Sequence, residues 1–351
     1  MTDNHGIDRA LVDFDVLDRW MDGEGLPAGD IASVEMLAGG TQNHLIKFER
    51  GGRWFVLRRG PLHLRPRTND VLRREMRMLS ALAGSDVPHP GFIAGCPDES
   101  VMGGAVFYLM EPVDGFNPST GLPPLHAGSA EIRHEMGLQA ADAIARLGAV
   151  DYVAVGLADF GQPEGFIERQ VGRWMSELEG YSKNEGYPGP DIPGLSDVAA
   201  WLDANRPATW TPGIMHGDYH FANVMFAHDS GKLVAIVDWE MCTIGDPLLD
   251  LGWLLATWPE PGRPMGAGSA IAAAGGLCTP DEALAHYAAH TKRDLSAIAW
   301  YKVLACFKLG IVLEGTHARA CAGKAPKVTG DLLHATTLRL FEQATKLIAE
   351  A

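Results

Sequence analysis

The spacing of apolar residues changes several times along the chain, and each change predicts a different kind of element. Over residues 10–22 apolar residues recur every three or four positions, which predicts a short amphipathic helix that ends near Gly23. Further on, short apolar runs separated by glycine-rich turns are typical of strands. These strands are expected at residues 31–37, 44–49, 54–58, 92–95 and 105–111. Between the third and the fourth strand, an apolar stripe predicts a helix that we expect Thr68 to cap.

From Pro112 onward the pattern becomes mainly helical, after a turn-rich stretch that is typical of a linker. Helices are expected at about residues 128–148, 164–182, 194–204, 246–258, 280–290, 294–322 and 330–350. Apolar segments at 224–226 and 233–238 flank a turn and predict a hairpin among these helices, and the Gly- and Ala-rich stretch 262–276 predicts a surface loop.

These elements predict an α+β protein with three parts. Residues 1–29 are expected to form an N-terminal helical segment, residues 30–111 a small lobe built on an antiparallel sheet, and residues 112–351 a larger, mainly helical lobe.

Composition and charge narrow the class of protein. The chain has 351 residues, of which 46% are hydrophobic and 21% charged, as in ordinary globular proteins. Its formal net charge of −15 argues against a nucleic-acid or anionic-membrane partner. The stretch from Lys47 to Arg77 is nevertheless rich in arginine, which indicates either an anionic ligand nearby or a solvated face.

The cysteines and the N-terminus bear on where the protein works. The five cysteines are scattered and form no CxxC pair, so we expect neither a disulfide framework nor a zinc site, and a reducing cytoplasm fits best. Residues 1–9 are polar without an apolar signal core, and no uncharged stretch approaches the length needed to span a membrane. We therefore expect a cytoplasmic protein.

One stretch, residues 216–223, carries the residue types that phosphoryl transfer needs. Transfer from ATP requires ligands for divalent cations and a carboxylate that orients and deprotonates the attacking hydroxyl. Kinases place an aspartate and, five residues later, an asparagine in one loop, as in Asp218 and Asn223, and a second aspartate after the next hairpin, as in Asp238. We expect the three to converge, with Asp218 as the base and Asn223 and Asp238 as Mg²⁺ ligands.

Other interpretations of this stretch stay open. His216 could be a packed core histidine and Asp238 a turn former at a strand end. Alternatively, His216, Asp218 and His220 could bind a transition metal, as in a metal-dependent hydrolase, although no further cluster at ligand spacing completes such a site. An inactive nucleotide-binding module is a third class, but it would lack one of the base or metal groups, all of which are present.

Together with its surroundings, this stretch resembles the aminoglycoside phosphotransferase and choline kinase family. The family's H-G-D-x-x-x-x-N matches residues 216–223, its I-x-D-W/F-E matches 236–240, and its G-D-P-x-x-D-L matches 245–251. The resemblance covers about residues 30 to 320 and implies a two-lobed protein-kinase-like fold, ATP and Mg²⁺ as cofactors, and a small hydroxylated molecule as acceptor.

The resemblance also implies residues that bind the nucleotide. Gly39, Gly40 and Asn43 lie where such a fold covers the ATP phosphates with a loop, although a glycine pair between strands is often only a turn. Arginine replaces the family's lysine on the third strand; we assign that role to Arg58, with Glu75 as its partner. Arg59 is the alternative, but it points to the other face of the strand.

The hinge and the supporting residues complete the expected site. The carbonyl of Glu111 and the N–H of Val113 are expected to bond adenine. His216 is expected to position the loop, Asp250 to brace it by hydrogen bonds, and Glu240 to support the metal.

The C-terminal helices are expected to form the acceptor pocket. Arg169, Arg173, Tyr301 and His317 are the candidates, because they are polar groups in otherwise apolar helices. Gly148 stands where the family usually has a histidine, so packing or substrate contacts there differ.

The nature of these groups bears on the substrate. A polycationic aminoglycoside would favour carboxylates, whereas these helices offer arginine, lysine and histidine. The combination of Gly-Gly-x-x-Asn at 39–43, Val-Leu-Arg-Arg at 56–59 and Arg-Gln-x-x-Arg-Trp at 169–174 resembles the subgroup of kinase domains associated with acyl-CoA dehydrogenases. This resemblance implies a hydroxyacyl-CoA or related hydroxy acid as acceptor. An aminoglycoside or another amino alcohol is the alternative.

Overall fold

The computed structural model describes residues 7–37, 43–259 and 269–351. The chain divides into two compact units. The N-terminal unit comprises residues 1–115 and 234–242, and the helical unit comprises residues 116–233 and 243–351. The predicted boundaries at residues 29 and 111 stay a prediction.

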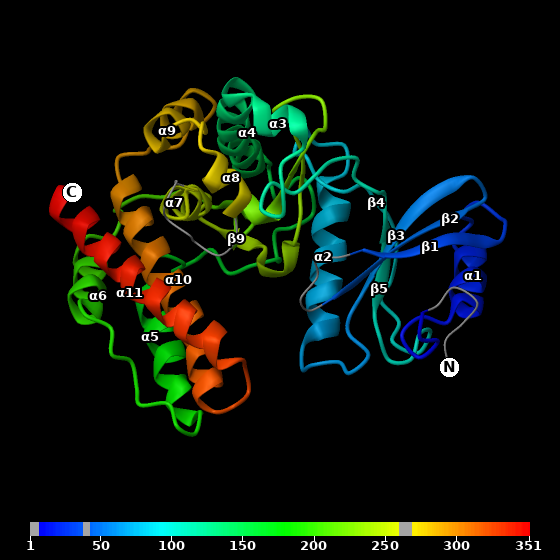
Figure 1. The fold of residues 1–351 in the computed structure, drawn as a ribbon, viewed down its shortest axis with the longest axis horizontal. Coiled ribbons are helices and arrows are strands. Elements are labelled where there is room, and N and C mark those ends of the chain that lie inside the picture. The colour runs from blue at the N-terminus through cyan, green and yellow to red at the C-terminus, as the bar shows by residue number, and fades with distance from the viewer. Residues whose placement is uncertain (1–6, 38–42, 260–268) are drawn as a thin grey trace. The chain divides into compact units, whose positions relative to one another are not determined.

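A five-stranded antiparallel sheet forms the centre of the N-terminal unit (Figure 1). The strands are β1 (Ile31–Leu37), β2 (His44–Arg50), β3 (Arg53–Arg59), β4 (Phe92–Cys96) and β5 (Phe107–Met110), in the order β1-β2-β3-β5-β4. Gly51 and Gly52 turn the chain from β2 into β3 with φ of +58° and +74°, a backbone conformation that favours glycine.

The two faces of this sheet bury different side chains. Helix α1 (Phe14–Gly23) packs on one face, where alternate residues of the central strands, such as Phe48, Phe55 and Leu57, join Leu17 in an apolar core. Helix α2 (Thr68–Leu82) lies on the other face (Figure 1). In β3 the neighbours of Arg58 belong to the opposite face of the sheet. The Arg58 side chain therefore lies on the face that α2 covers.

The expectation that Thr68 caps α2 is wrong. Thr68 is the first residue of the helix, and Arg67 occupies the cap position with a φ of +70° and no side-chain cap bond. The Thr68 hydroxyl accepts a hydrogen bond from the Arg65 N–H at 3.2 Å instead, so it closes the turn that precedes the helix.

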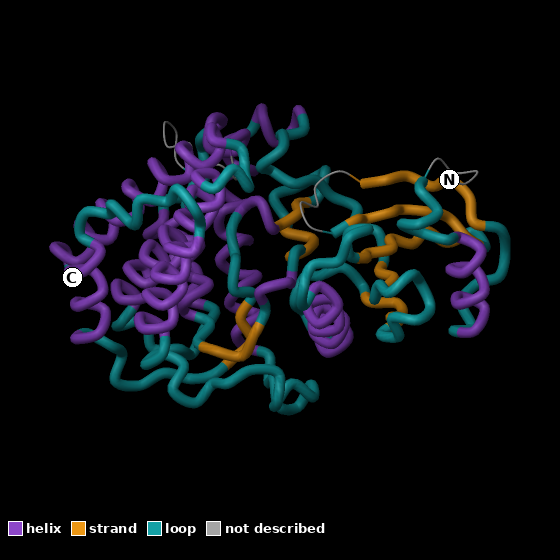
Figure 2. The backbone as a smooth tube through the Cα atoms, turned by 90° about the horizontal axis from the view of Figure 1, so that it is seen from below, coloured by secondary structure: helices purple, strands orange, loops and turns teal. Residues whose placement is uncertain are grey.

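Helices make up most of the helical unit, as the purple segments of Figure 2 show. They are α3 (Pro124–Gly128), α4 (Ala130–Ala149), α5 (Gln170–Gly180), α6 (Leu195–Ala204), α7 (Leu248–Ala256), α8 (Ser269–Ala274), α9 (Pro280–Ala289), α10 (Ile298–Cys321) and α11 (Lys327–Glu350). Helix α10 contacts α5, α6, α7 and α11 and is buried on most sides. The presence of α8 corrects the prediction that 262–276 is all loop, since alanine favours helix where it finds packing partners.

Short strands position the segment between residues 213 and 245. β6 (Gly213–Met215) pairs antiparallel with β9 (Thr243–Gly245), and β7 (Val224–Phe226) forms the predicted hairpin with β8 (Leu233–Ile236). The loop at 216–223 thus leaves the end of one ordered strand and returns into another.

Among the described residues, none of the helices is both long and apolar enough to cross a membrane.

Candidate active site

The loop at residues 216–223 is fixed to the helical unit through its backbone. Asp250, in the first turn of α7, is buried and accepts hydrogen bonds from the N–H groups of His216, at 2.6 Å, and Gly217, at 2.9 Å. Gly217 has a φ of +87°, which a residue with a side chain adopts only with strain. The loop therefore combines a glycine turn with a buried carboxylate that receives its backbone N–H groups.

A buried lysine holds the same turn from the other side. Lys308 of α10 donates from Nζ to the carbonyl of Gly217 at 2.7 Å, and Nζ lies 4.4 Å from the centre of the Trp253 ring. Burial, with the charge of Arg173, outweighs the attraction of Asp218 and Asp250 and lowers the pKa of Lys308 to about 8. Lys308 still carries its proton at neutral pH and brings a positive charge close to Asp218.

Asp218 lies between two neighbours that hold its carboxylate. Oδ1 is 3.3 Å from Nε2 of His220, and Asn223 donates from Nδ2 to Oδ2 at 3.1 Å and to the Asp218 carbonyl at 2.9 Å. Burial alone would raise the pKa of Asp218, but the hydrogen bond from His220 and the charges of His220, His216 and Lys308 lower it to about 2. Asp218 is therefore ionised throughout the physiological range.

His216 is fully buried and its Nδ1 accepts a long hydrogen bond, 3.4 Å, from the Asp218 N–H. The ring packs edge-on against Tyr219. The contacts of His216 are thus with the loop backbone and with the buried Tyr219 side chain.

In the N-terminal unit, Arg58 lies in a buried polar cluster. Its Nε lies 2.7 Å from Oε2 of Glu75, and its Nη2 lies 2.9 Å from Oε1 of the same carboxylate. The Tyr108 hydroxyl also donates to Oε2 of Glu75, at 2.8 Å. Burial opposes the charge of Arg58, but the adjacent Glu75 more than compensates, so the net pKa of Arg58 is raised. The structure thus brings Arg58 and Glu75 together.

Arg59 has a different environment. Its side chain is buried and donates from Nε to the carbonyl of Gly60 at 3.1 Å. Burial lowers the pKa of Arg59 to about 10. The alternation of the strand accounts for the difference between Arg58 and Arg59.

Asp238 belongs to the same unit and completes the Arg58 cluster. Its Oδ1 is 3.0 Å from the Arg58 guanidinium, and its backbone has φ +65° and ψ +63°. Residues other than glycine adopt this left-handed conformation seldom, and it recurs at functional sites. The carboxylate of Asp238 is partly exposed and offers oxygen donors of the kind that suit Mg²⁺.

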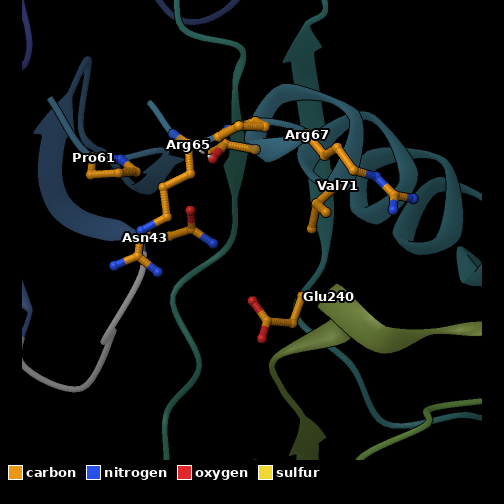
Figure 3. A pocket seen from close by; sticks show the side chains of 8 residues that line it. Asn43, Pro61, Arg65, Arg67, Val71 and Glu240 are labelled. Carbon is orange, nitrogen blue, oxygen red and sulfur yellow. Dashed lines mark hydrogen bonds between the residues drawn. The ribbon is translucent and has the colours of Figure 1, made fainter. Parts of the chain in front are cut away.

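A small pocket in the N-terminal unit gathers residues from the predicted nucleotide side. It is lined by Asn43, Pro61, Arg65, Pro66, Arg67, Thr68, Val71 and Glu240. Asn43 and Arg65 lie on one side and Glu240 on another (Figure 3). Its volume of about 120 Å³ is below the roughly 300–1,000 Å³ of pockets that hold a drug-sized ligand, so it has room for a part of a ligand only.

The remaining nucleotide candidates are the two expected hinge residues and the two glycines between β1 and β2. Glu111 follows directly after β5; its N–H donates to the Gly91 carbonyl at 2.8 Å and its side chain pairs with Arg53 at 3.0 Å. Val113 lies two residues further on and is partly buried. Gly39 and Gly40 lie outside the described residues.

The four acceptor candidates have different surroundings. Arg169 is exposed and bonds backbone carbonyls before α5, whereas Tyr301 is buried and bonds Asp246. His317 packs against His334 with ring centres 4.5 Å apart.

Arg173 shares a neighbour, Trp174, with the lysine that bonds the loop. It lies 5.1 Å from the Trp174 ring, and Nζ of Lys308 lies 5.5 Å from the same ring. The structure therefore connects Arg173, through Trp174 and Lys308, to the loop that carries Asp218.

Three contacts of the site go beyond what the sequence predicts. The sequence assigns no role to Lys308 or to Tyr108, which lies in the predicted strand 105–111, and it offers His220 only as a possible metal ligand. A lysine in the middle of an apolar helix is a signal that could have marked Lys308, since lysine is seldom buried without a partner.

The model of a phosphotransferase enzyme family matches residues 33–290, and the chain belongs to this family. Acyl-CoA dehydrogenase family member 11 of Gallus gallus is 30% identical over 308 residues, which cover 85% of this chain and 38% of that protein. The chain thus spans about two fifths of the length of this curated relative.

Solved structures agree with the fold. A crystal structure from Ralstonia eutropha, provisionally designated an aminoglycoside phosphotransferase, is 29% identical with a TM-score of 0.77 and covers 95% of this chain and 98% of its own. The GDP complex of aminoglycoside 2'-phosphotransferase-IIIa is 18% identical with a TM-score of 0.59, covers 93% and 96%, and supports the fold alone. The predicted α+β, two-lobed protein-kinase-like fold is confirmed, and the chain is a phosphotransferase.

Proposed function

We propose that the chain transfers the γ-phosphoryl group of ATP to the hydroxyl group of a small molecule, with Mg²⁺ as the metal cofactor. The observation that carries this proposal is the ionised Asp218, held between His220 and Asn223 on a loop fixed by Asp250 and Lys308. Such a rigid carboxylate suits a reaction in which catalysis consists mainly of positioning and electrostatics.

In the proposed reaction the hydroxyl oxygen of the acceptor forms a bond to the γ-phosphorus, while the bond from that phosphorus to the β–γ bridging oxygen breaks and ADP leaves. Asp218 orients the hydroxyl and receives its proton. Because the pKa of Asp218 is about 2, it is a weak base toward a free alcohol and takes the proton late, as the new oxygen–phosphorus bond makes the hydroxyl acidic.

On the nucleotide side, the proposal assigns roles within the N-terminal unit. Arg58, held by Glu75, contacts a phosphate; Asp238 holds Mg²⁺, with Glu240 in support; and Asn43, with Gly39 and Gly40, lies along the phosphates. The backbone of Glu111 and Val113 bonds adenine. In the helical unit Asn223 offers Oδ1 to Mg²⁺, because its Nδ2 bonds Asp218. When bound, Mg²⁺ would neutralise charge on the phosphates.

We further propose an anionic acceptor, a hydroxyacyl-CoA or a related hydroxy acid. The support is the positive charge of Lys308, close to Asp218, and that of Arg173, which lies beside the same Trp174 ring as Lys308. The similarity to acyl-CoA dehydrogenase family member 11 adds to it. A polycationic aminoglycoside would meet like charges there, which disfavours its binding.

The test is a screen of purified protein for ADP release from Mg·ATP with short 4-hydroxyacyl-CoA esters, free hydroxy acids and aminoglycosides. We expect turnover with a hydroxyacyl-CoA and none with the matched acyl-CoA that lacks the hydroxyl. Asp218→Ala should lower kcat by roughly 10²–10⁴-fold while leaving nucleotide binding and the thermal transition largely intact.

Two outcomes would contradict different parts of the proposal. Turnover with an aminoglycoside, and none with any hydroxyacyl-CoA or hydroxy acid, would remove the proposed acceptor class but not the kinase reaction. Full activity of Asp218→Ala would show that Asp218 is not the base.

A further inference from the structure

A cluster of histidine and carboxylate side chains joins α10 to α11 in the helical unit. Glu314 and His317 are three residues apart on α10, and Asp331 and His334 are three residues apart on α11, so each pair shares one helical face. Gly330 permits the close approach of the helices, because a Cβ there would clash with that of Ala320.

The cluster is compact and partly shielded from solvent. Glu314 is fully buried, and each of Glu314, His317 and His334 offers a donor atom within 4.8 Å of the others. His334 Nδ1 lies 2.7 Å from Oε2 of Glu314, while Tyr187 donates to Oε1 at 2.8 Å. The His317 and His334 rings stack with centres 4.5 Å apart.

One buried nitrogen of the cluster lacks a protein partner. Among the described residues, Nδ1 of His317 makes no hydrogen bond, and the nearest carboxylate oxygen recorded for it, on Asp331, is 3.9 Å away. The other nitrogen, Nε2, lies 3.7 Å from Sγ of Cys321, one turn further along α10. A buried ring nitrogen without a hydrogen bond is costly unless a ligand engages it.

We propose that Glu314, His317 and His334 bind one Zn²⁺ ion that cross-links α10 and α11. Two imidazoles and one carboxylate are a donor set that suits zinc rather than Mg²⁺, which prefers oxygen ligands. Tyr187 donates a hydrogen bond to the other oxygen of the Glu314 carboxylate and so orients it, as hydrogen bonds from outside the ligand set do at zinc centres.

From the absence of CxxC pairs we expected no zinc site. The proposed site differs from that expectation because it needs no CxxC pair. Its ligands come from two helices, and the stretch between His317 and His334 includes the connection between those helices. No short motif spans that distance.

The experiment is a calorimetric titration of the chelator-treated, dialysed protein with ZnSO₄, in excess Mg²⁺ to occupy oxygen-rich sites. We expect one tight equivalent of Zn²⁺ in the wild type and a rise in Tm on its addition. His334→Gln keeps a hydrogen-bond donor for the buried Glu314 but replaces an imidazole with a much poorer ligand. We expect the Kd for this Zn²⁺ ion to rise by more than roughly 10–100-fold, the loss of affinity that follows when only a hydrogen-bond partner of a ligand is changed.

The control variant is His290→Ala. His290 belongs to the other group of possible donors, with Asp142 and His286, and lies on the surface after α9. The proposal requires His290→Ala to keep the tight equivalent. It is overturned if the wild type binds no Zn²⁺ tightly, if folded His334→Gln binds it as well as the wild type, or if only His290→Ala loses it. His317→Ala provides a second ligand variant should His334→Gln fail to fold.

Discussion

Arg58 contacts two carboxylates through the planar fork of its guanidinium, a geometry that a lysine lacks. Its guanidinium reaches Glu75 through two nitrogens, at 2.7 and 2.9 Å, and Asp238 at 3.0 Å. The planar fork of arginine supports such a set, whereas an ammonium group is a compact point charge. Because Glu75 is fully buried, its charge depends on this partner and on Tyr108.

Removing that partner should therefore cost more than a surface ion pair does. Arg58→Met leaves the buried Glu75 without its cation, and we expect the free energy of unfolding to fall by about 3–5 kcal/mol. Adding Glu75→Gln removes the stranded charge, so the double variant should be more stable than Arg58→Met alone. Urea unfolding of the three proteins measures both differences.

The matched control is Arg53→Met, which breaks the exposed pair with Glu111 and should change the free energy of unfolding by at most about 1 kcal/mol. If Arg58→Met is no more destabilising than Arg53→Met, the buried cluster does not contribute as described.

At the scale of elements, α10 connects the catalytic loop to the helical core. The helix contacts α5, α6, α7 and α11, and Lys308 extends from it to the Gly217 carbonyl. Asp250 of α7 holds the N–H groups of the same turn, so two packed helices determine the backbone position of the residue before Asp218.

The burial of Lys308 has a consequence for stability that depends on pH. The folded pKa of about 8 lies below the unfolded value of about 10.4, so between these pH values the unfolded chain retains a proton that the folded chain has released. The free energy of unfolding should then rise with pH across this window, by up to about 1.4 kcal/mol per pH unit from this group.

Lys308→Met removes this contribution. We expect the wild type to gain stability over Lys308→Met as the pH rises from about 8 toward 10, measured by urea unfolding at a series of pH values. Lys302→Met, on the same helix but partly exposed, controls for the loss of a charge. If the free energies of unfolding of the wild type and Lys308→Met change in parallel with pH, the pKa of Lys308 is not lowered as described.

At the scale of the whole molecule, the sequence predicted what depends on local periodicity. The strands of the sheet, most of the helices and the two-lobed fold follow from apolar spacing and from the motifs at 216–223 and 236–240. The assignment of Arg58 to the face of Glu75 follows from strand alternation.

What the sequence did not predict depends on contacts between distant segments. Lys308 meets Gly217 across 91 positions, and Tyr108 meets Glu75 only because β5 pairs with β3 beneath α2. Thr68 and α8 were misjudged because a competing hydrogen bond and tertiary packing outweigh local propensity. The roles of the site residues in catalysis stay predictions.

The proposed nucleotide and acceptor residues belong mostly to different units, and this leads to a prediction for ligand binding. Arg58, Asn43 and Asp238 belong to the N-terminal unit, whereas Asp218, Arg173 and Lys308 belong to the helical unit. A ligand that binds only the native state suppresses local opening of the elements that it contacts, which slows amide hydrogen exchange there. Mg·ADP should therefore protect β3, the start of α2 and residues 234–242.

A hydroxyacyl-CoA should instead protect α5, the middle of α10 and the loop at 216–223. The matched acyl-CoA without the hydroxyl should have a comparable effect, because the proposed attraction to the positive charges of Arg173 and Lys308 does not need the reacting group. Hydrogen-exchange mass spectrometry with each ligand alone separates the two patterns. Arg173→Ala should reduce protection by the CoA ester and leave that by Mg·ADP unchanged. Protection by Mg·ADP confined to α5 and α10 would reverse the assignment of nucleotide and acceptor to the two units.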